Sequence, residues 1–217
     1  MVQHSLLAKE ITKLKKQLLA IGNQVAENLT DAVSAVERKD AAFARSISER
    51  DREIDQMEVD LEEECLKVLA LYQPVAIDLR FIVTVLKVNN DLERIGDLAA
   101  NIADQAEMLA SLQNVNIVFD FAQMAQKSQA MFTSSLNALI NTNVGSAHKV
   151  IIADDEIDEL HKQMYTQVEA AIARDLAGTK IYIMQIGLSR SLERVADLAT
   201  NIAQDIIYLS TGEIVRH

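Results

Sequence analysis

Residues 91–103 read DLERIGDLAANIA, and residues 191–203 read SLERVADLATNIA. The two stretches are identical at nine of thirteen positions and lie 100 positions apart. Positions four apart share one face of an α-helix, and each copy places a Glu, an Asp and an Asn at this spacing. These residues are Glu93, Asp97 and Asn101 in the first copy and Glu193, Asp197 and Asn201 in the second. Because apolar residues such as Leu92 and Ile95 fall on the opposite side, each copy predicts a helix that buries one side and presents oxygen ligands on the other.

The composition predicts an all-α protein. The 217 residues include one Pro, six Gly and only 4% aromatic residues, whereas 49% are hydrophobic. Few turn-forming residues and many apolar ones suit long helices and argue against a β architecture with many turns. The repeat at an offset of 100 further divides the chain into two halves.

The spacing of apolar residues predicts six helices of about thirty residues each. Pro74, the only proline of the chain, and Gly178 mark turns between helices. The expected helices cover approximately residues 5–38, 40–73, 74–109, 144–174 and 178–209, and a further helix carries the apolar residues from Phe121 to Leu139 and is broken at residues 141–145. Because the connecting loops are short, we predict two tandem antiparallel three-helix bundles, residues 1–112 and 113–217.

The helix that precedes each copy of the motif carries two further carboxylates, at the first and last positions of an Asp-x-Glu-Ile-Asp segment. They are Asp51 and Asp55 in the first half and Asp154 and Asp158 in the second. Residues on two antiparallel helices are level when their numbers average to the turn. The level pairs are Asp51 with Asp97, Asp55 with Glu93, Asp154 with Asp197, and Asp158 with Glu193. The first two pairs average to 74 and the last two to 175.5, so four carboxylates should converge in each half, across helix axes about 8 to 10 Å apart.

Four carboxylates in one volume repel one another, which raises their pKa values unless cations neutralise them. We therefore predict that each half binds a metal ion or a cluster of metal ions. All-oxygen ligands favour iron, manganese or magnesium, and zinc is less favoured because neither motif contains the His or Cys of a structural zinc site. The alternative is that the acidic faces are solvated, since 32 acidic residues in 217 produce roughly five such pairs by chance.

Basic and amide side chains accompany the carboxylates in both copies. Arg94 and Arg194 are expected either to contact phosphate or a partner at the edge of each cluster, or to form ion pairs within their own helix. Asn101 and Asn201 are expected to hydrogen-bond the carboxylates rather than to ligate metal themselves.

His161 follows Asp158 by three positions and is a candidate nitrogen ligand. The matching position of the first half is occupied by Glu58 instead. We therefore expect His161 to be solvated and not to bind metal.

The charge and the sequence pattern restrict the partners. A net charge of −11 disfavours nucleic acid and anionic membrane surfaces, whereas cations and basic protein surfaces are favoured. Cys65 is the only cysteine, so no disulfide forms within the chain. No signal-peptide pattern and no apolar run of about 18 residues is present, which predicts a cytoplasmic protein that reaches a membrane only through a partner. A homodimer is compatible with the sequence.

Three segments of the sequence resemble the PhoU family. Residues 91–97 read DLERIGD, residues 191–197 read SLERVAD, and residues 73–80 read QPVAIDLR. The likeness covers the whole chain, and it implies paired three-helix bundles whose acidic motifs hold metal clusters on the bundle surface. It also implies a cytoplasmic negative regulator of phosphate uptake and phosphate-responsive signalling. By the same resemblance, the protein should bridge the ATPase subunit of a phosphate ABC transporter and a membrane sensor histidine kinase.

The chain departs from the family pattern at a few positions. Ala196 replaces the Gly that is usual in the motif, and Leu98 and Leu198 stand where many relatives carry His. The second half also lacks the Pro and the Asp-Leu-Arg segment of the first. These differences bear on whether the two halves bind metal in the same way.

Two other classes of protein fit parts of the pattern. A carboxylate-bridged di-metal enzyme in a helical bundle needs inward-pointing Glu-x-x-His pairs, and the sequence has none. A metal-free helical scaffold would leave the acidic faces solvated, and its metal content would distinguish it. Because the sequence shows neither a catalytic triad nor a glycine-rich phosphate loop, we expect a metal-binding adaptor that is not an enzyme.

Overall fold

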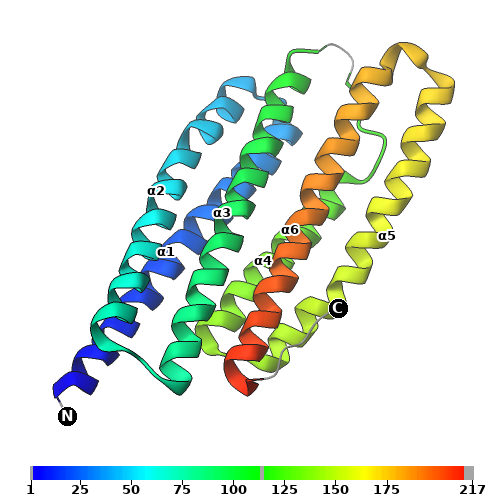
Figure 1. Ribbon diagram of the computed structural model, residues 1–217. Helices are drawn as coiled ribbons and strands as arrows, with labels where there is room; N and C mark the ends of the chain where they lie inside the picture. Colours follow the sequence, from blue (N-terminus) through cyan, green and yellow to red (C-terminus); the bar gives the residue numbers. More distant parts are fainter. Residues whose placement is uncertain (1, 113–114, 213–217) are drawn as a thin grey trace.

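In the computed structural model, residues 2–112 and 115–212 are described, with side chains from residue 6 onward. These residues form six α-helices and one short 3₁₀ helix, η1 (Figure 1). The elements are α1 (Val2–Arg38), α2 (Ala41–Tyr72), α3 (Ala76–Ala110), α4 (Phe121–Asn141), α5 (Val144–Arg174), η1 (Leu176–Gly178) and α6 (Thr179–Thr211). No strand occurs in the described residues, and the predicted all-α class is confirmed.

Short polar side chains begin several of the helices. Asp40 accepts a hydrogen bond from the backbone N–H of Phe43 at 3.0 Å and caps α2. Asp120 and Asn143 accept corresponding bonds at the starts of α4 and α5. Because the first N–H groups of a helix lack partners within it, these caps fix where each helix starts.

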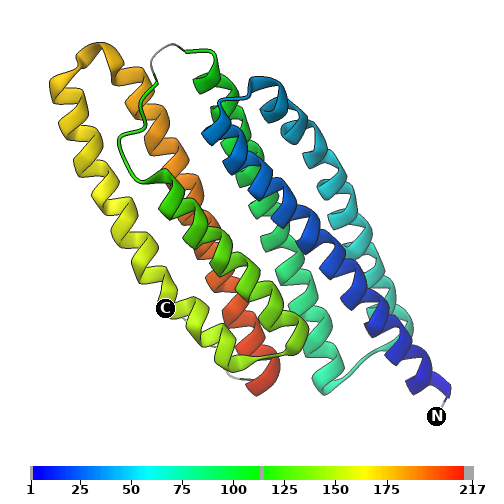
Figure 2. The ribbon, with the colours of Figure 1, turned by 180° about the vertical axis from the view of Figure 1, so that it is seen from behind.

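The helices form two three-helix bundles that lie side by side. In Figure 1, α2, α3, α6 and α5 follow one another across the front, and Figure 2 shows α1 and α4 covering them from behind. α1 packs on α2 and α3, α4 packs on α5 and α6, and the two bundles meet through α3 with α6 and through α1 with α4. The predicted pair of bundles is confirmed. The predicted boundary falls at residue 113, which lies outside the described residues.

The repeated motif buries the side that the sequence predicts. In α3 and α6 the apolar positions of the motif are almost completely buried. They are Leu92, Ile95, Ala99 and Ile102, and Leu192, Val195, Ala199 and Ile202. Leu98 and Leu198 are also buried.

Three contacts set the register of α3 against α6. Lys87 Nζ lies 2.8 Å from Asp205 Oδ1, and the side chain of Gln105 packs on Gly187. A Cβ on Gly187 would lie 2.6 Å from Gln105 Oε1, so a larger residue there would displace this side chain. Both pairs have residue numbers that average to 146, which shows that the two helices run antiparallel.

The third contact, with the same average, joins Arg80 to the end of α6. Gly212 ends this helix in the left-handed conformation, with φ of 77°, and its N–H bonds to the carbonyl of Tyr208. A Cβ at Gly212 would lie 2.5 Å from Arg80 Nη1. Glycine is therefore required at position 212 for two reasons: its left-handed backbone conformation and the close approach of the Arg80 guanidinium.

The hairpin turns lie where the sequence predicts them. α2 ends at Tyr72 and α3 begins at Ala76, so the first turn is centred on Pro74. The second turn contains η1, where Asp175 accepts hydrogen bonds from the N–H of Gly178 and the hydroxyl of Tyr182. The two turns lie at opposite ends of the molecule (Figure 1), as expected for antiparallel halves.

Replacing Ile54 with Ala should lower the free energy of unfolding by about 2–5 kcal/mol, because the fully buried side chain leaves a cavity between α2 and α3. The same substitution at Ile183, which is 58% exposed on α6, should change it by no more than about 0.5 kcal/mol. Urea unfolding followed by circular dichroism measures both values. Similar losses in the two variants would contradict the packing described.

Candidate functional site

The first acidic surface lies between α2 and α3. Burial, followed by the charges of Asp55 and Asp97, raises the pKa of Asp51 to about 6. The pKa of Glu93 is raised by burial and then by Asp97 and Asp55. The carboxylates of the two helices therefore act on one another across the hairpin. We call Asp51, Asp55, Glu93 and Asp97 the first acidic site.

The second acidic surface lies between α5 and α6. Burial, Asp197, Asp158 and Asp154 raise the pKa of Glu193, in that order. The pKa of Asp197 is raised by burial and by Asp158, while Arg194 opposes this shift. We call Asp154, Asp158, Glu193 and Asp197 the second acidic site. The duplication thus places four interacting carboxylates at matching positions in both halves.

The chemistry of these donors fits a hard cation, although their side chains are not closed around one point. Within residues 2–112 and 115–212, no three His, Cys, Asp or Glu side chains are arranged to hold one ion. Carboxylate oxygens are the ligands that magnesium, manganese and iron take, and a cation between them would remove the repulsion that raises their pKa values. Metal binding by the two acidic sites stays a prediction.

A glycine lets the first acidic site approach α3 closely. A Cβ on Gly96 would lie 3.2 Å from Asp51 Oδ1 and 3.4 Å from Ile54 Cγ2. The second half carries Ala196 at this position, and its methyl group is completely buried. The two acidic sites are therefore bounded differently on the side of the motif helix.

The two arginines of the motif interact with neighbouring carboxylates. Arg94 Nη1 lies 3.6 Å from Asp91 Oδ1, three positions earlier on α3. Asp91 is 8% exposed, and its pKa is raised to about 6 by burial and by Asp205, against the opposing effects of Arg94 and Lys87. Of the two predicted roles, the structure shows for Arg94 the ion pair within its own helix.

The two asparagines of the motif are exposed. Asn201 lines a groove of about 290 Å³ between α3 and α6. The other residues that line this groove are Lys87, Asn90, Asp91, Gln204 and Asp205. The predicted hydrogen bonds from Asn101 and Asn201 to the carboxylates stay a prediction.

His161 is only partly solvated, because one ring nitrogen is hydrogen-bonded within the protein. Its ring is partly buried, and Nδ1 lies 2.7 Å from the hydroxyl oxygen of Ser189, a fully buried residue of α6. The ring also contacts Tyr165 edge to face, with centroids 5.1 Å apart. Burial and Arg190 lower the pKa of His161, while Asp158 and Asp197 raise it. The prediction rested on Glu58 at the matching position of the first half, and the contact with Ser189 could not be foreseen because it joins α5 to α6.

Asn89 and Ser189 were not predicted as part of the site, but each links the two helices of its hairpin: Asn89 bonds to Glu58 of α2, and Ser189 to His161 of α5. Asn89 donates from Nδ2 to the backbone oxygen of Glu58 at 2.9 Å and to its carboxylate at 3.3 Å. Asn89 and Ser189 lie four positions before Glu93 and Glu193. Extending the spacing of four by one step toward the N-terminus would have found both.

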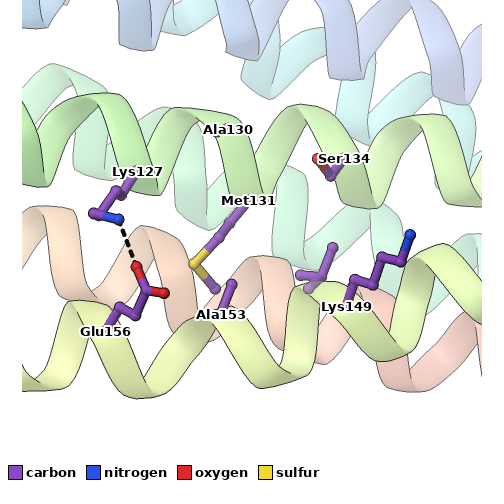
Figure 3. A pocket seen from close by; sticks show the side chains of 8 residues that line it. Lys127, Ala130, Met131, Ser134, Lys149, Ala153 and Glu156 are labelled. Atoms are coloured by element: carbon purple, nitrogen blue, oxygen red, sulfur yellow. Dashed lines mark hydrogen bonds and ion pairs between the residues drawn. The ribbon is translucent and has the colours of Figure 1, made fainter.

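A separate groove of about 250 Å³ lies between α4 and α5 (Figure 3). Lys127 of α4 and Glu156 of α5 form an ion pair across it, and Met131 points between the two helices. Lys149 and Ser134 lie farther along the groove. It shares no residue with the acidic sites, so it adds nothing to the predicted metal ligands.

The family model of the PhoU domain matches this sequence twice, at residues 18–106 and at residues 121–206. This chain belongs to the PhoU family. The two matches coincide with the two bundles, and the resemblance found in the motifs is confirmed. None of the described helices combines the length and the apolar character that crossing a membrane requires.

Relatives in the PhoU family extend over nearly the whole chain. The phosphate-specific transport system accessory protein PhoU homolog of Aquifex aeolicus is 36% identical over 211 residues, covering 97% of this chain and 96% of the relative. PhoU homolog 1 of Thermotoga maritima is 32% identical over 214 residues, covering 98% and 92%. The crystal structure of PhoU from Pseudomonas aeruginosa matches with a TM-score of 0.92 and 32% identity, covering 95% of this chain and 99% of that chain. The family is one of accessory proteins and not of enzymes.

The raised pKa of Asp51 makes metal-free protein less stable as the pH rises. The carboxyl group titrates at 3.8 in the unfolded chain and at about 6 in the folded one, so the folded state binds the proton more tightly. This contribution is present below pH 3.8 and is lost as the pH rises through about 6. Asp51→Asn should therefore raise the free energy of unfolding at pH 7.5 by about 1 kcal/mol, after allowing for solvent screening.

Urea unfolding between pH 4 and 8, in the presence of a chelator, measures this effect. Asp155→Asn is the control, because it removes the same charge from an exposed position of α5. The control should keep the pH dependence of the parent, whereas Asp51→Asn should flatten it. Parallel pH profiles for all three proteins would show that Asp51 is not under electrostatic strain.

Proposed function

We propose that this chain is a metal-binding accessory protein of a phosphate transport system. In this proposal it is a negative regulator of phosphate uptake and of phosphate-responsive two-component signalling. The family match and the names of the relatives support the link to phosphate transport. Its binding partners are the ATPase subunit of the transporter and a sensor histidine kinase, and its location is the cytoplasm.

The observation that carries the metal-binding part is the repeated repulsion between carboxylates. In both halves, burial and a carboxylate on the facing helix of the hairpin raise the pKa of other carboxylates: those of Asp51 and Glu93 in the first half, and those of Glu193 and Asp197 in the second. Neighbouring carboxylates of this kind cost stability unless a cation is bound, and both halves of the chain contain them. The oxygen donors favour iron, manganese or magnesium over zinc.

Regulation follows from binding rather than from catalysis. The family is not one of enzymes, so an effect on the transporter or the kinase must arise from contact. A bound protein shifts a partner between two states only by as much as its affinities for those states differ. We expect tighter binding to the state that each partner adopts when phosphate is abundant.

The competing function is a scaffold that binds no metal. The observation in its favour is that no three potential ligands within the described ranges are already arranged around one ion. In that case the acidic faces would serve as negatively charged contact surfaces for basic partners. Metal content therefore decides between the two functions.

Neutralising the first acidic site should remove metal from the first half while the second half keeps its own. The variant combines Asp51→Asn, Asp55→Asn, Glu93→Gln and Asp97→Asn. Elemental analysis of protein purified without chelator measures bound metal per chain. Metal content equal to that of the parent would rule out these residues as ligands.

The control variant removes four exposed acidic residues that lie outside both acidic sites. Its substitutions are Glu27→Gln, Glu37→Gln, Asp60→Asn and Glu63→Gln. It changes the net charge by the same amount and should leave the metal content unchanged. Metal loss in this variant as well would show that binding follows overall charge rather than the acidic sites.

Deleting the gene should leave phosphate-starvation genes expressed in phosphate-rich medium, because the kinase loses its restraining partner. A reporter fused to a starvation promoter measures this. Restoring the parent gene should repress the reporter, and a gene carrying the four substitutions in the first acidic site tests whether metal is needed. Repression that persists after deletion would contradict the regulatory role.

A further inference from the structure

The turn between α4 and α5 allows the two halves to be compared position by position. Asp40 caps α2 and Asn143 caps α5, each through its side chain. The residues directly before them, Lys39 and Thr142, both have a left-handed backbone, with φ of 53° and 48°. Both pairs lie 103 positions apart. At this offset α1 and α2 correspond to α4 and α5.

The groove between α4 and α5 lies where the first half has an ion pair. Arg50 of α2 and Asp31 of α1 form this pair, and both side chains are partly buried. The corresponding residues of the second half are Ala153 and Ser134, which line the groove. Their short side chains cannot meet between helices whose axes lie about 8 to 10 Å apart. The groove is therefore open because two small residues replace an ion-paired Arg and Asp.

The floor of this groove is apolar. Met131 and Val150 line it and are 4% and 2% exposed, so they lie at its bottom (Figure 3). Met131 corresponds to Asn28, a buried polar residue of the first half. The volume of about 250 Å³ is sufficient for one large apolar side chain. The second half thus offers an open apolar slot where the first half has polar side chains.

The two ends of the groove carry cations. Lys127 forms its ion pair with Glu156 at one end, and Lys149 lies at the other end beside Ser134 (Figure 3). Among the described side chains, Lys149 has no ion-pair partner. The lining therefore contains two Lys and one Glu, although the whole chain has a net charge of −11. A negatively charged group is the complementary ligand for the Lys149 end.

The spacing of these features matches one face of a helix. Ser134 follows Met131 by three positions on α4, so the apolar floor and the Lys149 end lie about one helical turn apart, roughly 5 Å. A partner helix presents residues three or four positions apart at about this separation. An apolar residue and an acidic residue at that spacing can therefore reach both features. Ile152, three positions after Lys149, is 70% exposed and extends the apolar surface on α5.

We infer that the groove between α4 and α5 is a docking site for an acidic amphipathic helix of a partner protein. An apolar side chain of this helix packs on Met131 and Val150, and a carboxylate one turn away pairs with Lys149. The inference concerns the second half alone, because the ion pair occupies the corresponding position of the first. It does not depend on metal binding by the acidic sites.

The probe for this site is an alanine-based helical peptide of about 16 residues that carries one Leu and, four positions later, one Glu. It is titrated in the presence of a chelator into the full chain with isotope-labelled methionine methyl groups, and Met131→Leu identifies the NMR signal of Met131. That signal should shift and reach saturation. Replacing the peptide's Leu with Ala should weaken binding by about 10-fold or more, because the apolar contact is lost. Replacing its Glu with Lys should also weaken binding, because Lys149 then repels it.

Variants of the protein test the groove directly. Ala153→Arg combined with Ser134→Asp introduces the ion pair of the first half and should abolish binding. Lys149→Ser, which introduces the residue type of the corresponding Ser46, should weaken binding by about 2- to 5-fold. Lys162→Ser is the matched control, because Lys162 is exposed on the same helix outside the groove, and it should leave the affinity unchanged. Circular dichroism identifies a variant that fails to fold, in which case Lys149→Ser and the peptide substitutions decide.

The possible results either support the inference or overturn it. Binding that needs both the Leu and the Glu of the peptide and is weakened by Lys149→Ser supports it. The absence of a shift of the Met131 signal, or equal binding of the peptides with Glu and with Lys, overturns it. Self-association of the parent in sedimentation velocity that Ala153→Arg with Ser134→Asp abolishes would assign the groove to a second copy of this chain instead of a partner. Because metal is absent throughout, none of these results bears on the proposed metal binding.

Discussion

Burial of α3 and α6 on three sides is the constraint on which the structure depends. α3 packs against α1, α2 and α6, and α6 packs against α4, α5 and α3. Each motif helix therefore has one narrow strip open to solvent, and the repeated acids occupy it. Small buried residues such as Ala99, Ala103 and Ala199 let the neighbouring helices approach closely. The same thirteen positions thus hold the bundles together and carry the candidate site.

The antiparallel hairpins bring the carboxylates of two helices close together. Short turns keep α2 beside α3 and α5 beside α6, so residues that are distant in sequence become level. Burial and neighbouring carboxylates raise the pKa values of Asp51, Glu93, Glu193 and Asp197, which costs stability when these groups are ionised. A stable apolar core beneath them, including the fully buried Leu92 and Leu192, offsets this cost. Stability comes from one side of each motif helix and binding chemistry from the other.

Duplication has given two halves that share a plan but differ at their acidic sites. Gly96 and Ala196 bound the acidic sites differently, and Glu58 and His161 place different donors beside them. The seam between the halves is asymmetric as well, since the buried Asp91 corresponds to Ser191 in the second half. These differences lie beside the acidic sites and at the seam between α3 and α6. The cores can therefore stay alike while the sites diverge.

The sequence by itself determined the helical class, the repeat, the turn at Pro74 and the acidic face of each motif. These features follow from local spacing, because residues four apart share a helix face wherever the helix is placed. Only the tertiary structure decided that α3 packs antiparallel on α6, with Gly187 and Gly212 admitting side chains from the other half. It also decided that His161 hydrogen-bonds Ser189, which lies 28 positions away in the sequence. Such contacts join different helices, and no periodicity within one helix encodes them.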